Sequence, residues 1–235
     1  NLGNATLKIG KTTLSTEINA DQFSDLMRDI SGNRQIIKSI TTRFDTAEAL
    51  KQEILKHLDC DDVKSENDLL LGACTGTAFN EEGLKSLLDI LFGGGKNDAK
   101  LAESIASFLE KSPEHRVSHF QDYARAFLTQ KNEIRKKLCS KGVSEKIPNA
   151  EDILYTEATR VLAVMDKVKS FRLAKFTYDI LNVGQAIVTA YEKIKSSHIQ
   201  LDYDDLIFYT ARLLSNSDQA GWVLYKMDRG IDHIL

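Results

Sequence analysis

The sequence predicts an all-α protein: a multi-helix bundle that carries one long strut helix. Only two prolines, Pro113 and Pro148, occur in 235 residues, well below the usual content of about 5%. Apolar residues recur every three or four positions through most of the chain, which is the period of an amphipathic helix. Between residues 150 and 197 there is no proline and a single glycine, Gly184, so nothing there compels a helix to end.

Composition excludes several classes of protein. The chain is 42% apolar and 28% charged, which argues against disorder and low complexity. A net charge of −3 excludes a globally basic nucleic-acid-binding protein but not a local basic patch. No apolar run approaches the length of a membrane span, and the three cysteines lack metal-type spacing. We therefore expect a cytoplasmic protein with no membrane contact.

Local start and stop signals divide the first part of the chain. Residues 1–20 are expected to be extended or irregular, and residues 21–170 to form a helical domain. One helix is expected from Asp21 and a second after the break at Gly32-Asn33. A third is expected to open with a capping box at Asp45–Glu48 and to run through Leu58, and a fourth to run from Asn80 to the glycines at 93–95. Two more are expected to begin at Asn97 and at Ser112-Pro113.

The helical run over residues 150–197 is expected to form the strut. At 1.5 Å per residue, a single helix of this length spans about 70 Å, which is enough to bridge two packing units. A kink near Ser170 or Gly184 is equally allowed by the sequence. Shorter helices are expected over residues 202–214 and 219–227.

Both ends of the sequence suggest a longer parent protein. The first residue is Asn1 rather than methionine, and the last five residues, Ile231–Leu235, are largely apolar. We expect this pentamer to be a strand that continues in the parent chain, because an apolar strand needs neighbours to bury it.

Two glycine-lysine motifs resemble phosphate-binding loops without meeting their requirements. Residues 5–12 satisfy the spacing A-x4-G-K-T around Lys11, but the interior Thr-Leu-Lys-Ile is too bulky to wrap backbone N–H groups around phosphates. Gly93-Gly-Gly-Lys96 lacks a following serine or threonine, and a helix terminus followed by a turn explains it better.

The acidic run Asp202-Tyr-Asp204-Asp205 has a catalytic and a structural interpretation. A two-metal nuclease would need carboxylates that converge from several elements, which one run cannot supply. Acidic residues also favour the N-terminus of a helix, with Asp202 as the cap, and we favour this interpretation. The histidines and serines form no recognisable catalytic set.

The segment 128–148 is the one clearly basic stretch of the chain. It contains six cations against two acids, Glu133 and Glu145. The cations are Lys131, Arg135, Lys136, Lys137, Lys141 and Lys146. Such a cluster predicts a contact with phosphate backbones, although a merely solvated surface has the same composition. Aromatic residues are not interleaved with the cations, so sequence-neutral contact with a duplex is favoured over stacking on single strands.

The C-terminal third carries motifs that occur together in a known family. They are Ala190-Tyr-Glu-Lys-Ile-Lys195, the block Leu201, Asp202, Tyr203, Asp204, Asp205, Leu206 and Ile207, then Trp222-Val-Leu-Tyr-Lys226 and Ile231–Leu235. Their order resembles the region just before the Walker B box of UvrD/Rep-like superfamily 1 DNA helicases. It is most similar to the AddA subunit of alphaproteobacterial helicase–nucleases.

Upstream, Phe127-Leu-Thr-Gln-Lys131 with Arg135-Lys136 and Lys141 is similar to an AddA stretch of the form Leu-Thr-x-x-Gly-x-x-Arg-Lys. Asn132 and Ile134 stand here in place of the usual Gly and Pro. The specific part of the resemblance covers about half of the chain.

The resemblance implies a fragment of an ATP-dependent DNA helicase and exonuclease subunit that acts in double-strand break repair and recombination. Residues 21–170 would be the helical 1B insertion, which lies beside duplex DNA in relatives. Residues 171–235 would return to the RecA-like 1A motor core, and residues 201–235, without its sheet, would be partly exposed or repacked. The parent would bind ATP and magnesium and pair with an AddB-type nuclease, whereas this piece would bind no cofactor, hydrolyse nothing, and contact DNA through Lys131, Arg135, Lys136, Lys137 and Lys141.

Two other functions stay open from the sequence. A helical protein–protein interaction or scaffold module with no nucleic-acid role is favoured by the net charge of −3. A nucleotide-binding enzyme that uses Lys11 would require ATP to stabilise the fold.

Overall fold

A computed structural model describes residues 20–215 and 217–227, and every element named in these ranges is an α-helix. The prediction of an all-α protein is confirmed for this part of the chain. The helices are α2 (Ala20–Gly32), α3 (Arg34–Thr41), α4 (Ala47–His57), α5 (Glu66–Cys74), α6 (Glu81–Phe92), α7 (Lys96–Leu109), α8 (Pro113–Phe127), α9 (Lys141–Lys146), α10 (Ala150–Ser197), α11 (Tyr203–Ser215) and α12 (Ser217–Met227). The loop resembling a phosphate site at Lys11 and the strand expected at 231–235 lie outside the described residues.

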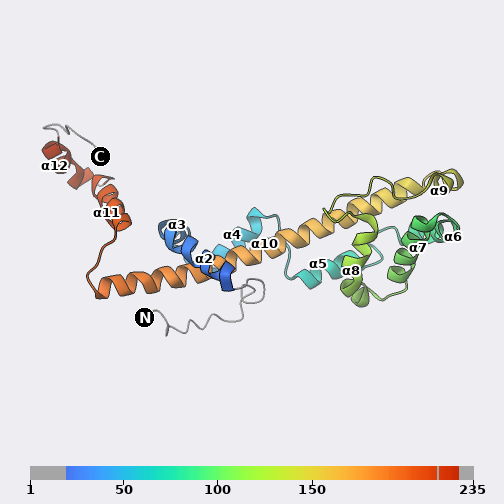
Figure 1. Cartoon of the computed structure of the whole chain (residues 1–235), viewed down its shortest axis with the longest axis horizontal. Helices are drawn as coiled ribbons and strands as arrows, with labels where there is room; N and C mark the ends of the chain where they lie inside the picture. The colour runs from blue at the N-terminus through green and yellow to red at the C-terminus, as the bar shows by residue number, and fades with distance from the viewer. Residues whose placement is uncertain (1–19, 216, 228–235) are drawn as a thin grey trace.

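The 48-residue helix α10 is the axis of the molecule (Figure 1). It runs without a break through Ser170 and Gly184, so the alternative of a kink at either position is not realised. The helix is about 70 Å long at the standard rise per residue. Residue 170, the expected limit of the first domain, lies in the middle of this helix.

The helices α5–α9 pack around the first half of α10 and form what we call the distal lobe (Figure 1). Its core contains Leu87, Phe120 and Leu154 from three different helices. The rings of Phe108 and Tyr123 stack with centroids 3.9 Å apart. Burial of these aromatic and aliphatic side chains removes apolar surface from water and is the main stabilising contribution of the lobe.

Helices α2, α3 and α4 pack along the rest of α10. A Cβ atom on Gly184 would lie 3.2 Å from Cδ1 of Ile37. Gly184 therefore allows a close approach between α3 and α10, rather than a bend in the strut. Ile30, Ile37 and Val188 form the small buried cluster at this contact.

The C-terminal helices α11 and α12 contact each other and extend away from the lobe, beyond the other end of α10 (Figure 1). Ile199, with φ 52°, turns the chain after α10. Large apolar side chains on these helices are exposed, among them Leu206, Ile207, Tyr209, Trp222 and Tyr225. Residues 201–235 were expected to be partly exposed or repacked, and in the described part of that range many apolar side chains are exposed.

Most predicted helix starts are confirmed, and four are misplaced by one or two residues. Two of these are α2, which begins at Ala20 rather than Asp21, and α12, which begins at Ser217 rather than at 219. The caps at Asn80, Ser112 and Asp202 lie where expected. The helix expected to open with a capping box at Asp45 begins instead after Thr46, whose Oγ1 accepts the N–H of Ala49 at 3.1 Å.

The helix expected from Asn97 begins one residue earlier, at Lys96, with Gly95 as the N-cap. The carboxylate of Asp98 explains this start, because it accepts the N–H of Gly95 at 2.8 Å.

Candidate nucleic-acid interface

The first part of the basic segment is a tight loop that leaves the end of α8. An isolated antiparallel bridge joins Leu128 to Ile134, and the N–H of Thr129 donates to the carbonyl of Glu133 at 2.8 Å. At the tip, Asn132 has φ 58°. Asparagine is one of the few residues other than glycine that adopts this left-handed conformation readily.

Three contacts hold the loop and the following residues against the lobe. The Arg135 guanidinium donates to the carbonyl oxygen of Arg125 at 2.9 Å, and so satisfies a free carbonyl at the C-terminal end of α8. The N–H of Ser140 donates to Asp98 at 2.9 Å. Ile134 and Leu138 pack against the core, and Cys139 is buried within it.

Asp98 is the residue that ties this segment to α7. Its burial would raise the pKa of its carboxyl, but the hydrogen bonds from Ser140 and Gly95 outweigh that effect and hold the pKa below its usual value. Asp98 is therefore a charged anchor at neutral pH. Because it lies 42 residues before Ser140, its role had no signal in the sequence.

The expected DNA-contacting residues lie together on this anchored segment. Arg135, Lys136 and Lys137 are consecutive and exposed, and Lys131 and Lys141 are exposed on either side. Among the described residues, the four lysines form no ion pair. By contrast, Lys38 near the other end of α10 pairs with Glu192 at 2.9 Å.

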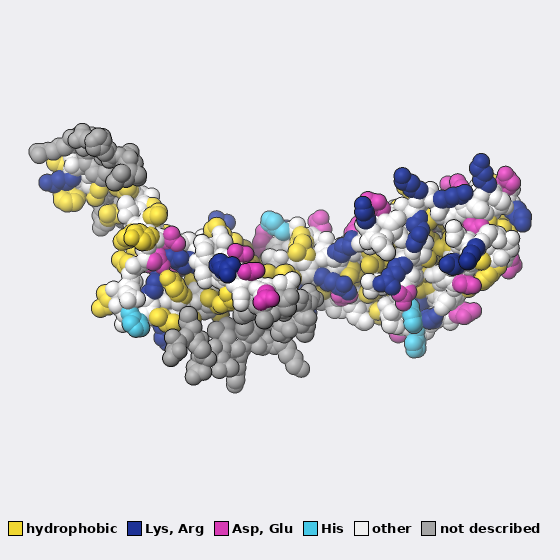
Figure 2. Space-filling model, in the orientation of Figure 1, with side chains coloured by type: hydrophobic (Ala, Val, Ile, Leu, Met, Phe, Trp, Pro, Cys, Tyr) yellow, Lys and Arg dark blue, Asp and Glu magenta, His cyan; other side chains and the backbone are white. Residues whose placement is uncertain are grey.

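Many basic side chains are scattered over the visible face of the distal lobe, with acidic ones between them and along its edges (Figure 2). Positive charges that form no ion pair attract anions more strongly than paired ones. The electrostatics of the segment therefore suit a polyanion.

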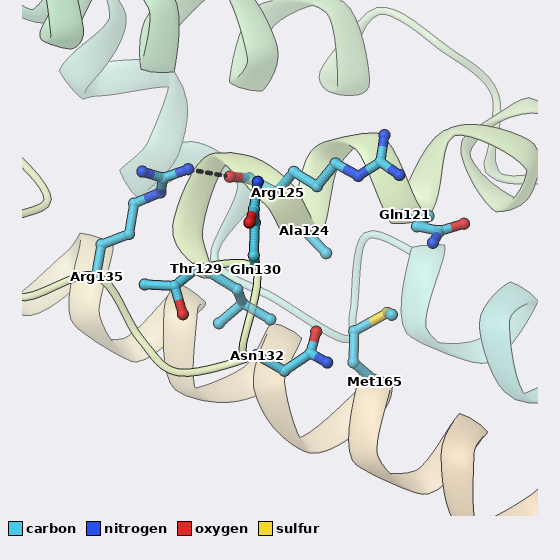
Figure 3. Close-up of a pocket in the computed structure, with 9 residues that line it drawn as sticks. Gln121, Ala124, Arg125, Thr129, Gln130, Asn132, Arg135 and Met165 are labelled. Atoms are coloured by element: carbon cyan, nitrogen blue, oxygen red, sulfur yellow. Dashed lines mark hydrogen bonds between the residues drawn. The ribbon is translucent and has the colours of Figure 1, made fainter.

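Three shallow hollows meet at this segment, and Arg135 lines all of them. The largest, of about 600 Å³, lies between α8, the loop and α10 (Figure 3). Arg125 lines two of the three hollows and pairs with Asp122 at 3.0 Å. Arg125 was not among the predicted residues, because it precedes the basic segment and joins it only through the fold.

The residues of the family-like block lie at the other end of the strut (Figure 1). Asp202 and Asp205 form a reciprocal cap of α11, in which each carboxylate accepts the backbone N–H of the other at 3.0 Å. This confirms the cap interpretation of the acidic run. Leu201, Tyr203 and Leu206 are exposed.

Basic side chains surround the acids of this block. Asp202 pairs with Arg34 at 2.5 Å and with Lys195 at 3.3 Å, and Lys195 also pairs with Asp205. Asp204 pairs with Arg34 at 3.0 Å. The described residues contain no group of three or more side chains that could hold a metal ion.

The pKa of Asp202 is lowered to about 2. Burial would raise it, but the hydrogen bonds from the Asp205 N–H, Tyr191 and Lys195, together with the charge of Arg34, have the larger effect. The structure thus brings the predicted residues into two separate sets, a basic one on the lobe and an acidic one at the joint between α10 and α11.

Comparisons with known proteins give no neighbour. No protein-family model matches the chain, and neither a curated protein nor a solved structure matches it. None of the described helices combines the length and the apolar character needed to cross a bilayer.

Proposed function

We propose that this chain is part of an ATP-dependent DNA helicase of the UvrD/Rep-like superfamily 1 type, most similar to AddA, and that its distal lobe contacts duplex DNA. The single observation that supports the DNA contact is the cluster of exposed, unpaired lysines beside Arg135. A duplex presents a regular line of phosphates, and neutralising them releases counterions and favours binding.

The shape of the molecule supports the same function. The basic segment lies at one end of α10, and α11 and α12 lie beyond the other end (Figure 1). A strut of about 70 Å would hold the DNA-contacting lobe away from a motor attached at α11 and α12. In the helicase, parts of the parent protein other than this chain would bind ATP and magnesium, and an AddB-type nuclease would be the cytoplasmic partner, as the resemblance implies.

A second function is favoured by one specific observation. The exposed side chains of Ile207, Tyr209, Trp222 and Tyr225 place large apolar groups on helices that pack on little else. Exposed apolar groups of this size are typical of protein contacts. A helical interaction or scaffold module with no role in nucleic-acid binding would use this surface alone.

Fluorescence anisotropy with a labelled duplex, measured over a series of salt concentrations, distinguishes the two functions. The test variant replaces Lys131, Lys136 and Lys137 with glutamate and leaves Arg135, which holds the end of α8, in place. DNA contact predicts that affinity falls with salt and that the variant lowers the log–log slope by about 3, close to one unit for each lost phosphate contact.

The matched control reverses three exposed cations that lie outside the distal lobe, Arg43, Lys56 and Lys193. Both variants change the net charge equally, so a general charge effect would weaken binding in both. Equal loss in the two variants, or no binding by the wild type at low salt, would contradict DNA contact through the lobe and favour the interaction module.

A further inference from the structure

Of the three hollows that Arg135 lines, the largest has a lining of a different composition from the other two. Its lining includes two arginines, Arg125 and Arg135, and three residues with carboxamides, Gln121, Gln130 and Asn132 (Figure 3). No acidic residue lines it. The other two hollows contain acids, Asp122 in one and Glu151 with Asp152 in the other.

Apolar groups also contribute to the lining of this hollow. Ala124 and Leu128 come from the end of α8 and the start of the loop, and Met165 comes from α10. Ala124 and Leu128 are buried, and Met165 is half-buried against the core. The hollow therefore offers a few apolar contacts beside a larger number of hydrogen-bonding groups.

The hollow is preformed by backbone contacts. The N–H of Arg135 donates to the carbonyl of Phe127 at 3.0 Å. The N–H of Asn132 donates to the carbonyl of Thr129, also at 3.0 Å. The side chain of Arg135 is held by the Arg125 carbonyl. The volume of the hollow, about 600 Å³, lies within the usual range for ligand sites of about 300–1,000 Å³.

We propose that this hollow receives one unpaired nucleotide of the bound DNA, a base displaced from the duplex at a bulge or a fork. The assignment rests on the proposed contact of the lobe with DNA and deepens it. The two guanidinium groups meet the flanking phosphates, since arginine binds phosphate with a planar pair of donors.

The carboxamides receive the base. Each carries both a donor and an acceptor, so they can pair with the edge of any base, while Met165 and Leu128 contact its face. Asp122 pairs with Arg125 at 3.0 Å but does not itself line this hollow, so a phosphate meets less repulsion here than in the other two hollows, whose linings contain acids.

Competition between two labelled duplexes tests this site: a fully paired one, and the same duplex with a single unpaired nucleotide. The wild type is expected to bind the bulged duplex about tenfold more tightly, the preference that one well-made set of base-edge hydrogen bonds supplies. The variant Gln121→Ala/Gln130→Ala/Asn132→Gly removes all three amides. Glycine at 132 keeps the left-handed backbone.

The triple variant is expected to lose the preference for the bulged duplex and to bind the paired duplex as the wild type does. Gln52→Ala, which removes an exposed amide on α4, should change neither affinity.

Equal binding of both duplexes by the wild type would overturn the nucleotide site while leaving the duplex contact intact. Failure of the wild type to bind either duplex would overturn the duplex contact itself, and with it the nucleotide site. Equal weakening of both duplexes in the triple variant would also overturn the nucleotide site, because the amides would then act on the loop rather than on a base.

Discussion

Arg34 and Asp202 are 168 positions apart in the chain, and their side chains form an ion pair at 2.5 Å. Arg34 begins α3, and Asp202 caps α11. Lys195, from the last turn of α10, contacts Asp202 as well. One carboxylate therefore joins the start of the C-terminal helices to both the strut and the helix that packs beside it.

Arg34→Gln is expected to loosen this joint without unfolding the lobe. The Arg34 side chain is 10% exposed. It pairs with Asp202 and Asp204, donates to the Ser31 carbonyl at 3.3 Å and lies over the ring of Tyr191, and the glutamine removes the charge on which the ion pairs depend. Hydrogen exchange of the amides in the first turn of α11 should become several-fold faster, while exchange in α7 and α8 stays the same. Arg43→Gln, an exposed arginine nearby, is the matched control. Unchanged exchange in α11 would show that the cap alone holds the helix start.

The lowered pKa of Asp202 predicts an acid-sensitive joint. The ordinary value is 3.8, and the value in the structure is about 2. Because the charged form is favoured in the folded state, its stabilisation is fully present above pH 3.8 and is lost as the pH falls through about 2. The backbone amide of Asp205 donates to this carboxylate, so its NMR shift should titrate with a midpoint near the lower value. A midpoint at the ordinary value would contradict the hydrogen-bonded arrangement.

The buried contact among Tyr123, Glu157 and Arg160 predicts a graded loss of stability. The Tyr123 hydroxyl donates to Glu157 at 2.8 Å, and Arg160 donates to both carboxylate oxygens at 2.6 and 2.8 Å. Tyr123→Phe removes one hydrogen bond and should cost about 1 kcal/mol. Glu157→Gln leaves Arg160 largely buried without its charged partner and should cost about 3 kcal/mol.

Urea unfolding of the two variants measures this difference. Tyr155→Phe, on the exposed side of the same helix, is the control and should be neutral. A smaller loss for Glu157→Gln than for Tyr123→Phe would mean that the ion pair contributes nothing beyond its hydrogen bonds.

Gly184 predicts a coupling between the strut and α3. Alanine in a helix is more favourable than glycine by about 1 kcal/mol, but a Cβ here would lie 3.2 Å from Cδ1 of Ile37. We expect Gly184→Ala to gain little in the wild type and close to the full amount in an Ile37→Val background, which lacks that atom. A double-mutant cycle in urea measures the coupling. Equal gains in both backgrounds would show that Ile37 moves aside freely.

Local signals determined much of the fold from the sequence. The caps at Asn80, Ser112 and Asp202 act on residues within one helical turn, so the positions of the starts could be predicted without knowing any neighbour. The same holds for the strut, since the absence of proline is a property of the chain itself. The wrong starts at Asp45 and Asn97 were each misplaced by one residue. The helix expected from Asn97 has Gly95 as its N-cap, and the carboxylate of Asp98, inside the helix, accepts the N–H of that glycine.

The basic residues of the candidate interface were also visible in the sequence, because five of the predicted cations lie within eleven positions of one another. Only the tertiary structure brings Arg125 beside Arg135 and surrounds the hollow between them with amides. It also decides that Arg34 binds Asp202, and that Gly184 serves a close packing contact rather than a kink. These contacts join residues far apart in the chain, and sequence spacing carries no information about which distant side chains meet once the apolar faces pack.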